Sequence, residues 1–460
     1  MTWDNPRRMR ERMSLVDAAW LRMDRPENTA DVVALLGMQE LPSRDVLLRI
    51  LEERLLPYRR LRKRTAVGVF GASWQDQPNF VLAHHLESVR LTERGPALEE
   101  LVGRIASEPL DPSRPPWCLY AVELPGAGAL VAKLSHCLAD GFALIGLMLS
   151  LTDGARDRSL RQAFPVSRSP LLGKAPALET LARPGRLLDL GANTAALCGA
   201  AARMIALPAD PVTSLSRPLC GRRRVAWSAG FSLASLRALA RVEKVTVNDL
   251  LLAALAGALG EQLALASGSA RVESLRALVP VNLRKSLAEP DADPLGNEFG
   301  LVFLDLPVAE RSRRHRLALI HARTTALKAG SDGIASFLLL TALGLLPVGT
   351  PSVFRFFSRK ASLVVTNVPG PSEHLFLAGK RIDHVMFWVP HPATLGLGVS
   401  LLSYAGEVRV GVRADVAVVP DPGGLVRHFE AELAAFGAPR PERGGESPSL
   451  TERPGSEPRA

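Results

Sequence analysis

The sequence is poor in aromatic residues, which make up only 5% of its 460 residues. Leu, Ala and Val must therefore supply most of the core, which suits a protein of helices and sheets better than an aromatic-rich binding barrel. Hydrophobic residues make up 47% and charged residues 22%, so the chain can bury a sizeable core and is not disordered overall. Its length exceeds that of one ordinary core, and two domains are expected.

The sequence also lacks the cysteine spacings of a disulfide framework or a zinc site. Its four cysteines, Cys118, Cys137, Cys198 and Cys220, include no CxxC pair, which fits a reducing, cytosolic setting. The charged N-terminus, MTWDNPRRMRERMS, has no apolar signal-peptide core. The longest apolar stretch, 334–346, has about 13 residues, short of the ~20 that cross a bilayer. We therefore expect a protein that does not span a membrane but can sit on a membrane surface.

Acidic residues are outnumbered by basic ones, 46 against 56, which gives a formal charge of +10. A basic surface can meet nucleic acid, an anionic membrane or a polyanionic small molecule such as a coenzyme. The basic residues cluster at 59–64, 222–224 and 311–316, and each run can also be a solvated helix face or strand edge. No helix-turn-helix, zinc-finger or aromatic stacking pattern accompanies them, so the sequence does not favour nucleic-acid binding.

Residues 1–152 are expected to form a first α/β domain. Ala129–Leu134 has the length and apolar character of a strand, and Ala143–Leu151 is typical of a helix. The domain thus closes with a strand, a turn and a helix.

The rest of the chain divides into a linker, a second domain and a tail. Prolines punctuate 153–216, a linker with one helix near Arg186–Leu207 that can contact a membrane or pack on the domain surface. Residues 217–437 are expected to form the second domain, which ends in a hairpin across Ala405-Gly406. Residues 438–460 are rich in Pro, Gly, Glu, Ser and Arg and are expected to be a disordered tail.

The turn between the strand and helix of the first domain carries the sharpest motif, Ser135-His136-Cys137-Leu138-Ala139-Asp140-Gly141. A histidine at a strand end can take a proton from an alcohol. Asp140 can orient the ring or brace the turn, and Gly141 can let the chain turn sharply into the helix. By itself, however, a lone His beside an apolar strand is more often a core residue than a catalyst.

Six further segments accompany this turn in a fixed order: DPSRPPWCLYAVE before it, then VTVNDLLLAAL, VPVNLRKSL, LGNEFG, VVTNVPGP and LLSYAGEVRVGVRAD. Together with the opening segment MSLVDAAWLRMD, the ordered set resembles the bacterial wax ester synthase/diacylglycerol acyltransferase family, a branch of the coenzyme A-dependent acyltransferases. The resemblance runs from about Met13 to about Pro422, which is nearly the whole chain apart from the tail.

The resemblance implies a fold and a reaction. The fold is α/β, with two chloramphenicol acetyltransferase-like domains, a long crossover linker and an active-site tunnel between the domains. The reaction is acyl-CoA-dependent O-acylation of a lipid hydroxyl, from diacylglycerol to triacylglycerol, from a long-chain alcohol to a wax ester, or both. Acyl-CoA is then a substrate, and no cofactor or metal is expected. The resemblance also implies a cytoplasmic protein that is peripheral on the inner membrane face or on lipid inclusions.

Particular residues take roles from the family's signature, His-His-x-x-x-Asp-Gly, whose second His is the base. His136 holds that position, with Asp140 and Gly141 completing the motif, and Ser135 replaces the first His. If the first His only supports the fold or lines the tunnel, Ser135 is tolerable; if it tunes the base or binds substrate, activity changes. Asn248, in the family's Asn-Asp motif, is a candidate amide donor to the oxyanion of the tetrahedral intermediate, or a helix cap.

Other matching positions are expected to bind substrate or to support the fold. Asn282, Arg284 and Asn367 are expected at the substrate site, and Arg284 can pair with Asp140 or form a surface salt bridge. Trp117 is expected to anchor the core. The coenzyme phosphates are expected to meet Arg223, Arg224 or the run after Tyr58, and the pair at 84–85 is expected to be structural.

Two other functions stay open. A condensation-type acyltransferase of secondary metabolism also carries a His-x-x-x-Asp-Gly turn, and a catalytically impaired lipid-surface protein would explain Ser135. The sequence has no G-x-S-x-G nucleophile elbow, which agrees with direct transfer without a covalent enzyme intermediate.

Overall fold

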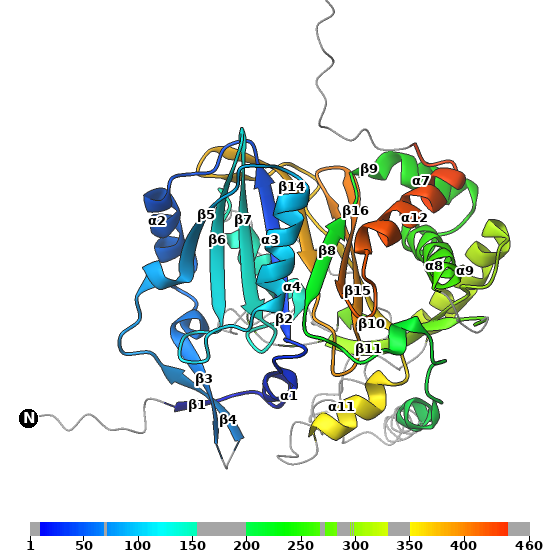
Figure 1. Ribbon diagram of the computed structural model, residues 1–460, viewed down its shortest axis with the longest axis horizontal. Coiled ribbons are helices and arrows are strands. Elements are labelled where there is room, and N and C mark those ends of the chain that lie inside the picture. The colour runs from blue at the N-terminus through cyan, green and yellow to red at the C-terminus, as the bar shows by residue number, and fades with distance from the viewer. Residues whose placement is uncertain are drawn as a thin grey trace, which may run out of the picture.

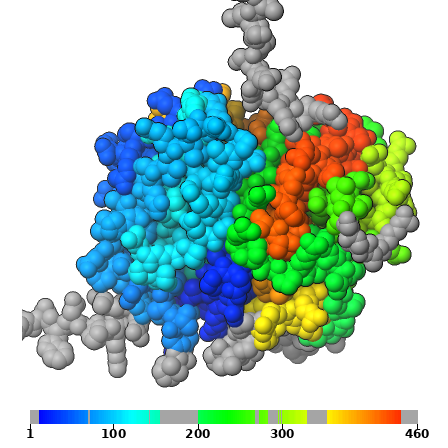
Figure 2. Space-filling model, in the orientation of Figure 1, coloured from blue at the N-terminus to red at the C-terminus, as the bar shows by residue number. Residues whose placement is uncertain are grey.

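The computed structural model describes residues 10–68, 71–153, 199–266, 272–282, 295, 297, 299–329 and 350–439. Two large sheets lie side by side, and helices cover them (Figure 1). The space-filling view shows the N-terminal half in blue and cyan meeting the C-terminal half in green, yellow and red (Figure 2). The predicted mixed α/β fold in two halves is confirmed.

The first sheet has six strands in the order β13-β14-β2-β7-β6-β5. Its centre is β2, whose eight residues are all buried, paired with β7. The strands from the N-terminal half are β2 (Asp31–Met38), β5 (Leu86–Arg90), β6 (Trp117–Leu124) and β7 (Ala127–Ser135). The helices of this half are α1 (Leu15–Met23), α2 (Arg44–Arg54), α3 (Pro96–Ser107) and α4 (Gly141–Ser150).

The second sheet has seven strands, in the order β11-β10-β12-β15-β16-β8, with β9 also paired to β16. They are β8 (Arg223–Trp227), β9 (Phe231–Ser232), β10 (Leu275–Asn282), β11 (Phe299–Leu306), β12 (Leu363–Pro369), β15 (Leu397–Tyr404) and β16 (Glu407–Asp415). Its helices are α7 (Leu233–Val242), α8 (Val247–Leu265), α9 (Arg313–Ala329) and α12 (Pro422–Ala435), while α11 (Thr350–Ser358) contacts α1.

The second half also contributes two strands to the first sheet. Strand β14 (Lys380–Trp388) pairs antiparallel with β2, and β13 (Phe376–Leu377) pairs with β14. This pairing satisfies the edge of β2, which would otherwise expose unpaired backbone groups. The expected second domain, 217–437, therefore does not pack as one unit, because 376–388 complete the sheet of the first.

Smaller expectations can be compared with the structure directly. The hairpin across Ala405-Gly406 is confirmed, with φ of 48° and 81° at the two turn residues, the left-handed values that a tight hairpin turn needs. Of the expected helix at Arg186–Leu207, residues 199–206 are helical and the rest lie outside the described residues. A separate small sheet joins β1 (Arg10–Arg12), β4 (Gly71–Asp76) and β3 (Lys63–Gly68).

Candidate active site

His136 is the first residue after β7, where the first sheet meets the turn into α4. Its backbone N–H donates a 2.8 Å hydrogen bond to the carbonyl oxygen of Ala30. Asp31 in β2 and Ser135 in β7 are register partners beside it. The two central strands therefore fix the backbone at His136, and the predicted sequence of strand, turn and helix is confirmed.

The His136 ring packs against aromatic side chains from both halves of the molecule, and these two side chains also contact each other. The indole of Trp20 in α1 stacks on it, with ring centroids 4.0 Å apart and 19° between the planes. Phe299, the first residue of β11, lies 5.6 Å away at 56°. His136 is 6% exposed. The sequence analysis gave no role to Trp20 or Phe299, although both lie in segments that carry the family resemblance.

The buried position of His136 determines its protonation state. Burial lowers the pKa of its imidazole to about 4, because the charged form loses its hydration, while the charge of Asp140 acts in the opposite direction. Nδ1 is buried and has no hydrogen-bond partner among the described residues. The ring is therefore uncharged at neutral pH, which is the form that can accept a proton.

Asn297 connects the second half of the chain to this turn. Its Nδ2 donates to the His136 carbonyl oxygen at 2.9 Å and to Asp17 Oδ1 at 2.7 Å. Arg60 donates to the other carboxylate oxygen of Asp17 at 3.2 Å and to the Leu138 carbonyl at 3.3 Å. Burial raises the pKa of Asp17, although the hydrogen bond from Asn297 and the charge of Arg60 act to lower it. The sequence analysis did not predict this group of contacts. Asp17 and Asn297 could have been noticed because they lie in MSLVDAAWLRMD and LGNEFG, two of the segments that carry the family resemblance.

Asp140 and Gly141 begin α4. The Asp140 carboxylate accepts a 2.9 Å hydrogen bond from the Ala143 N–H and so caps the helix. This placement favours bracing of the turn. Gly141 is the first residue of α4 and its φ lies outside the left-handed region, so the turn into the helix does not require a backbone conformation specific to glycine. A Cβ at Gly141 would meet no described atom within 4 Å.

Asn248 and Asn367 meet in the second half. Asn367 Nδ2 donates to Asn248 Oδ1 at 2.8 Å, so two residues predicted for the site lie in contact. The capping alternative for Asn248 is wrong: Thr246 caps α8 and forms a capping box with Asp249. In the described part of the chain, neither asparagine hydrogen-bonds to His136.

Asp249, the neighbour of Asn248, holds α8 to α9. Its buried carboxylate accepts from the Thr324 hydroxyl at 2.6 Å and lies 2.8 Å from His321 Nδ1. Burial raises the pKa of Asp249, but these hydrogen bonds outweigh it and the pKa is lowered overall. Asp249 thus fixes the end of the helix that carries Asn248.

The remaining predicted site residues are less informative. Ser135 is 2% exposed, and its hydroxyl lies 3.3 Å from Cys137 Sγ, so in this structure it packs inside the turn. Asn282 ends β10, where its backbone pairs with Phe299; its side chain is not described. Arg284, and with it the expected pair with Asp140, lies outside the described residues.

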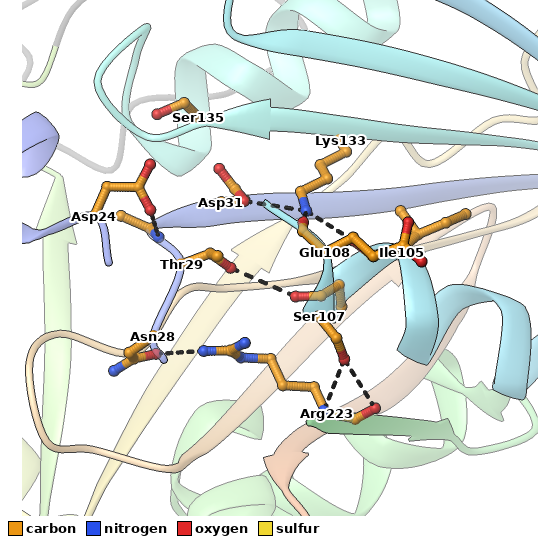
Figure 3. Close-up of polar contacts among 12 residues, drawn as sticks. Asp24, Asn28, Thr29, Asp31, Ile105, Ser107, Glu108, Lys133, Ser135 and Arg223 are labelled. Carbon is orange, nitrogen blue, oxygen red and sulfur yellow. Dashed lines mark hydrogen bonds and ion pairs between the residues drawn. The ribbon is translucent and has the colours of Figure 1, made fainter. Parts of the chain in front are cut away.

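A buried polar network joins the two sheets beside the turn (Figure 3). The Lys133 ammonium lies 3.2 Å from the Asp31 carboxylate and donates to the Ile105 carbonyl at 2.7 Å. Arg223 donates to Asn28 Oδ1 at 2.9 Å and is 4% exposed. Because its guanidinium is held here, the expectation that Arg223 meets the coenzyme phosphates is wrong.

Trp117 and His85 have the structural roles expected of them, whereas the His84 side chain is exposed. Trp117 is buried and donates its indole N–H to the Leu61 carbonyl at 2.8 Å. His85 stacks on Trp117 with centroids 4.3 Å apart, and its Nδ1 lies 2.8 Å from the Trp117 carbonyl. Within the described ranges, no group of three His, Cys, Asp or Glu side chains could hold a metal ion.

Two family models match the chain. The wax ester synthase/diacylglycerol acyltransferase catalytic domain matches residues 13–251, and the WS/DGAT C-terminal domain matches residues 295–436. A probable diacylglycerol O-acyltransferase of Mycobacterium tuberculosis is 29% identical over 92% of this chain and 95% of its own. A putative diacylglycerol O-acyltransferase of Mycobacterium bovis has the same identity and coverage.

Solved structures share the fold. The wax ester synthase/diacylglycerol acyltransferase from Marinobacter aquaeolei VT8 superposes with a TM-score of 0.66 at 20% identity, over 93% of this chain and 98% of that one. The first condensation domain of the CDA synthetase gives a TM-score of 0.59 at 15% identity, over 94% of this chain and 97% of that one. At these identities the likeness describes the two-sheet architecture and not the substrate.

Proposed function

The chain belongs to the wax ester synthase/diacylglycerol acyltransferase family, and we propose that it transfers an acyl group from acyl-CoA to a lipid hydroxyl with His136 as general base. The acceptors we propose are diacylglycerol, which gives triacylglycerol, and a long-chain alcohol, which gives a wax ester. The observation that carries the proposal is the uncharged, aromatic-stacked His136 at the junction of the two halves.

In the proposed reaction, a ring nitrogen of His136 takes the proton of the acceptor hydroxyl as the hydroxyl oxygen attacks the thioester carbonyl carbon. The tetrahedral intermediate then collapses, the carbon–sulfur bond breaks, and the CoA thiolate receives the proton held by His136. No covalent bond to the protein forms. No described atom lies within 4 Å of where a Cβ at Gly141 would be, which supports an approach of substrate to this side of the turn.

We propose Asn248 as the donor to the oxyanion of that intermediate. Its side-chain oxygen accepts from Asn367, which orients the amide so that its own N–H groups remain available. A fixed amide donor stabilises negative charge that develops on an oxygen in the transition state. Capping by Thr246 and the buried contacts of Asp249 hold this end of α8 rigid.

The direct test measures release of free CoA thiol by the purified protein with a long-chain acyl-CoA and either diacylglycerol or a fatty alcohol. Wild type should release thiol with both acceptors, and His136→Ala should abolish the release. His84→Ala, which changes a solvent-exposed histidine, is the matched control and should retain it. Equal release by wild type and His136→Ala would reject the base and favour the impaired lipid-surface protein.

We also propose that the protein works peripherally at a lipid surface, since its acceptor is apolar. In the described part of the chain, no helix is long and apolar enough to cross a membrane. Val67, in the β3–β4 hairpin, is 65% exposed, and Arg62 and Arg64 in the same segment are also exposed. Apolar and basic side chains together favour contact with an anionic lipid surface. Co-flotation with phosphatidylglycerol vesicles should fall in Val67→Ser; unchanged flotation would reject this surface.

A further inference from the structure

A cavity of about 580 Å³ lies between α1, α11 and the segment 209–219, at the lower edge of the molecule in Figure 1. Its floor is apolar and includes the buried side chains of Met23, Leu215 and Phe354. Four arginines line it, and we name it the arginine cavity after them: Arg25, Arg217, Arg355 and Arg359. In Figure 2 this face shows the yellow surface of α11 beside the dark blue surface of the N-terminal residues.

The four guanidinium groups have no carboxylate counter-ion within the described ranges of the chain. Across the residues that the structure describes, none of them forms an ion pair with a carboxylate, whereas Arg60, Arg276 and Arg316 do. Arg355 and Arg359 lie four residues apart, and the Arg359 N–H donates to the Arg355 carbonyl, so they share one helical face. Like charges in that arrangement are unfavourable unless an anion lies between them or beside them.

The carboxylates that line the cavity do not neutralise it. Asp210 accepts hydrogen bonds from the Arg276 backbone N–H and the Ser362 hydroxyl, and it lies 3.8 Å from the Arg276 guanidinium. Among the described residues that line the cavity, Glu27 is then the one remaining acidic group against four arginines. The cavity is positively charged, and guanidinium groups match phosphate oxygens in charge and geometry.

The cavity also lies close to the base along α1. Met23 in its floor is three residues beyond Trp20, or about 4.5 Å of helix rise, and Trp20 stacks on His136. Met23, Trp20 and Phe354 belong to one hydrophobic cluster. The charged cavity and the apolar side chains that lead from it to His136 therefore follow one another along α1. A ligand with phosphates at one end and a reactive apolar group at the other would meet them in that order.

From these observations we propose that the arginine cavity binds the phosphate groups of the acyl-CoA donor and so directs its thioester along α1 toward His136. The proposal rests on the acyltransferase function proposed above. In this proposal, phosphate binding, which the sequence analysis expected of Arg223, is done by four arginines that come together only in the folded chain. The same phosphate chemistry occurs in lipid headgroups, and the test below separates the two sources.

The test measures binding of free CoA by calorimetry to wild type and to the double variant Arg355→Glu/Arg359→Glu. Arg237→Glu/Arg241→Glu is the matched control, because it changes the same charge at two exposed arginines four apart on α7. We expect the CoA dissociation constant to rise about tenfold or more in the first variant and to stay within about twofold of wild type in the control. Arg217→Ala, which removes one guanidinium, should give a smaller rise.

Each outcome decides the proposal. Equal weakening in both double variants would mean a general charge effect and would overturn it, as would unchanged CoA binding in Arg355→Glu/Arg359→Glu. Loss of binding to phosphatidylglycerol vesicles with full CoA affinity would assign the cavity to lipid headgroups instead. Binding is independent of turnover, so arginine-dependent CoA binding without acyl transfer would reject the proposed function alone. Acyl transfer with an unchanged KM for acyl-CoA in the first variant would reject the cavity alone.

Discussion

The indole of Trp20 stacks on the imidazole of His136, with centroids 4.0 Å apart and an interplanar angle of 19°. The contact excludes water from one face of the ring, and burial lowers the pKa of His136 to about 4. A base that stays uncharged down to low pH keeps its proton-accepting form across the physiological range. Trp20, in the first helix, thereby influences a group at the end of the seventh strand.

Replacement of Trp20 should move the pH dependence of catalysis. In Trp20→Leu, water reaches the ring and the pKa of His136 rises toward its usual value near 6.5, so the acid limb of kcat/KM moves to higher pH. We also expect kcat to fall about tenfold to a hundredfold from poorer orientation. Trp20→Phe should retain the wild-type profile. A pH profile from 4 to 9 checks this, and an unshifted acid limb in Trp20→Leu would contradict it.

Acid should destabilise the folded protein through the same histidine. The unfolded chain binds a proton at His136 near pH 6.5, but the folded chain binds it only near pH 4. The contribution of the uncharged His136 to the free energy of unfolding is therefore fully present above about pH 6.5. It falls as the pH drops toward 4 and changes no further below that pH. By pH 5 the loss is about 2 kcal/mol. Urea unfolding at pH 7.5 and pH 5 should show a smaller loss in His136→Gln than in His84→Ala; equal losses would refute the assignment.

Asn297 should be essential for placing the turn. Asn297→Ala removes its bonds to the His136 carbonyl and to Asp17, and we expect kcat to fall about a hundredfold. Asn297→Asp should be worse, because it would set a second carboxylate against that of Asp17. Thermal unfolding should rank the three proteins wild type, Ala, Asp. An Asp variant as stable and active as wild type would show that the contact does not matter.

Asn248 and Thr246 provide a contrast between chemistry and stability at one helix end. Asn248→Ala should lower kcat about a hundredfold or more with little change in melting temperature, as loss of one oxyanion donor does. Thr246→Ala should cost about 1 kcal/mol of stability through the lost cap with kcat nearly unchanged. Steady-state kinetics and calorimetry on both variants check this. If Asn248→Ala leaves kcat unchanged, another donor must hold the oxyanion.

Restoring the family's first histidine should not improve the enzyme. Ser135 is 2% exposed and packs against Cys137, so Ser135→His overfills a closed space and should cost about 1–3 kcal/mol. We expect no rise in kcat. A substantial rise in thiol release would instead show that the first His tunes the base or binds substrate. Ser135→Ala, with no added volume, should behave like wild type.

The sequence alone predicted the family, the mixed α/β fold and the strand, turn and helix around His136. These features are local or ordered along the chain: an apolar run ends at a histidine, a carboxylate caps the next helix, and the motifs follow in one fixed order. The Asn248-Asp249 pair and Trp117 were also recognisable, because each lies in a short motif beside a regular helix or strand.

Contacts across long separations were decided only by the tertiary structure. Strand β14 completes the first sheet because the edge of β2 needs a partner, and no local pattern specifies which strand supplies it. Asn297 reaches His136 and Asp17 across 161 and 280 residues. The arginine cavity likewise gathers Arg25, Arg217, Arg355 and Arg359 from three distant segments. The sequence thus singled out His136 by its motif, while the fold determined which side chains cover its ring, which side chains hold its backbone and where the four arginines come together.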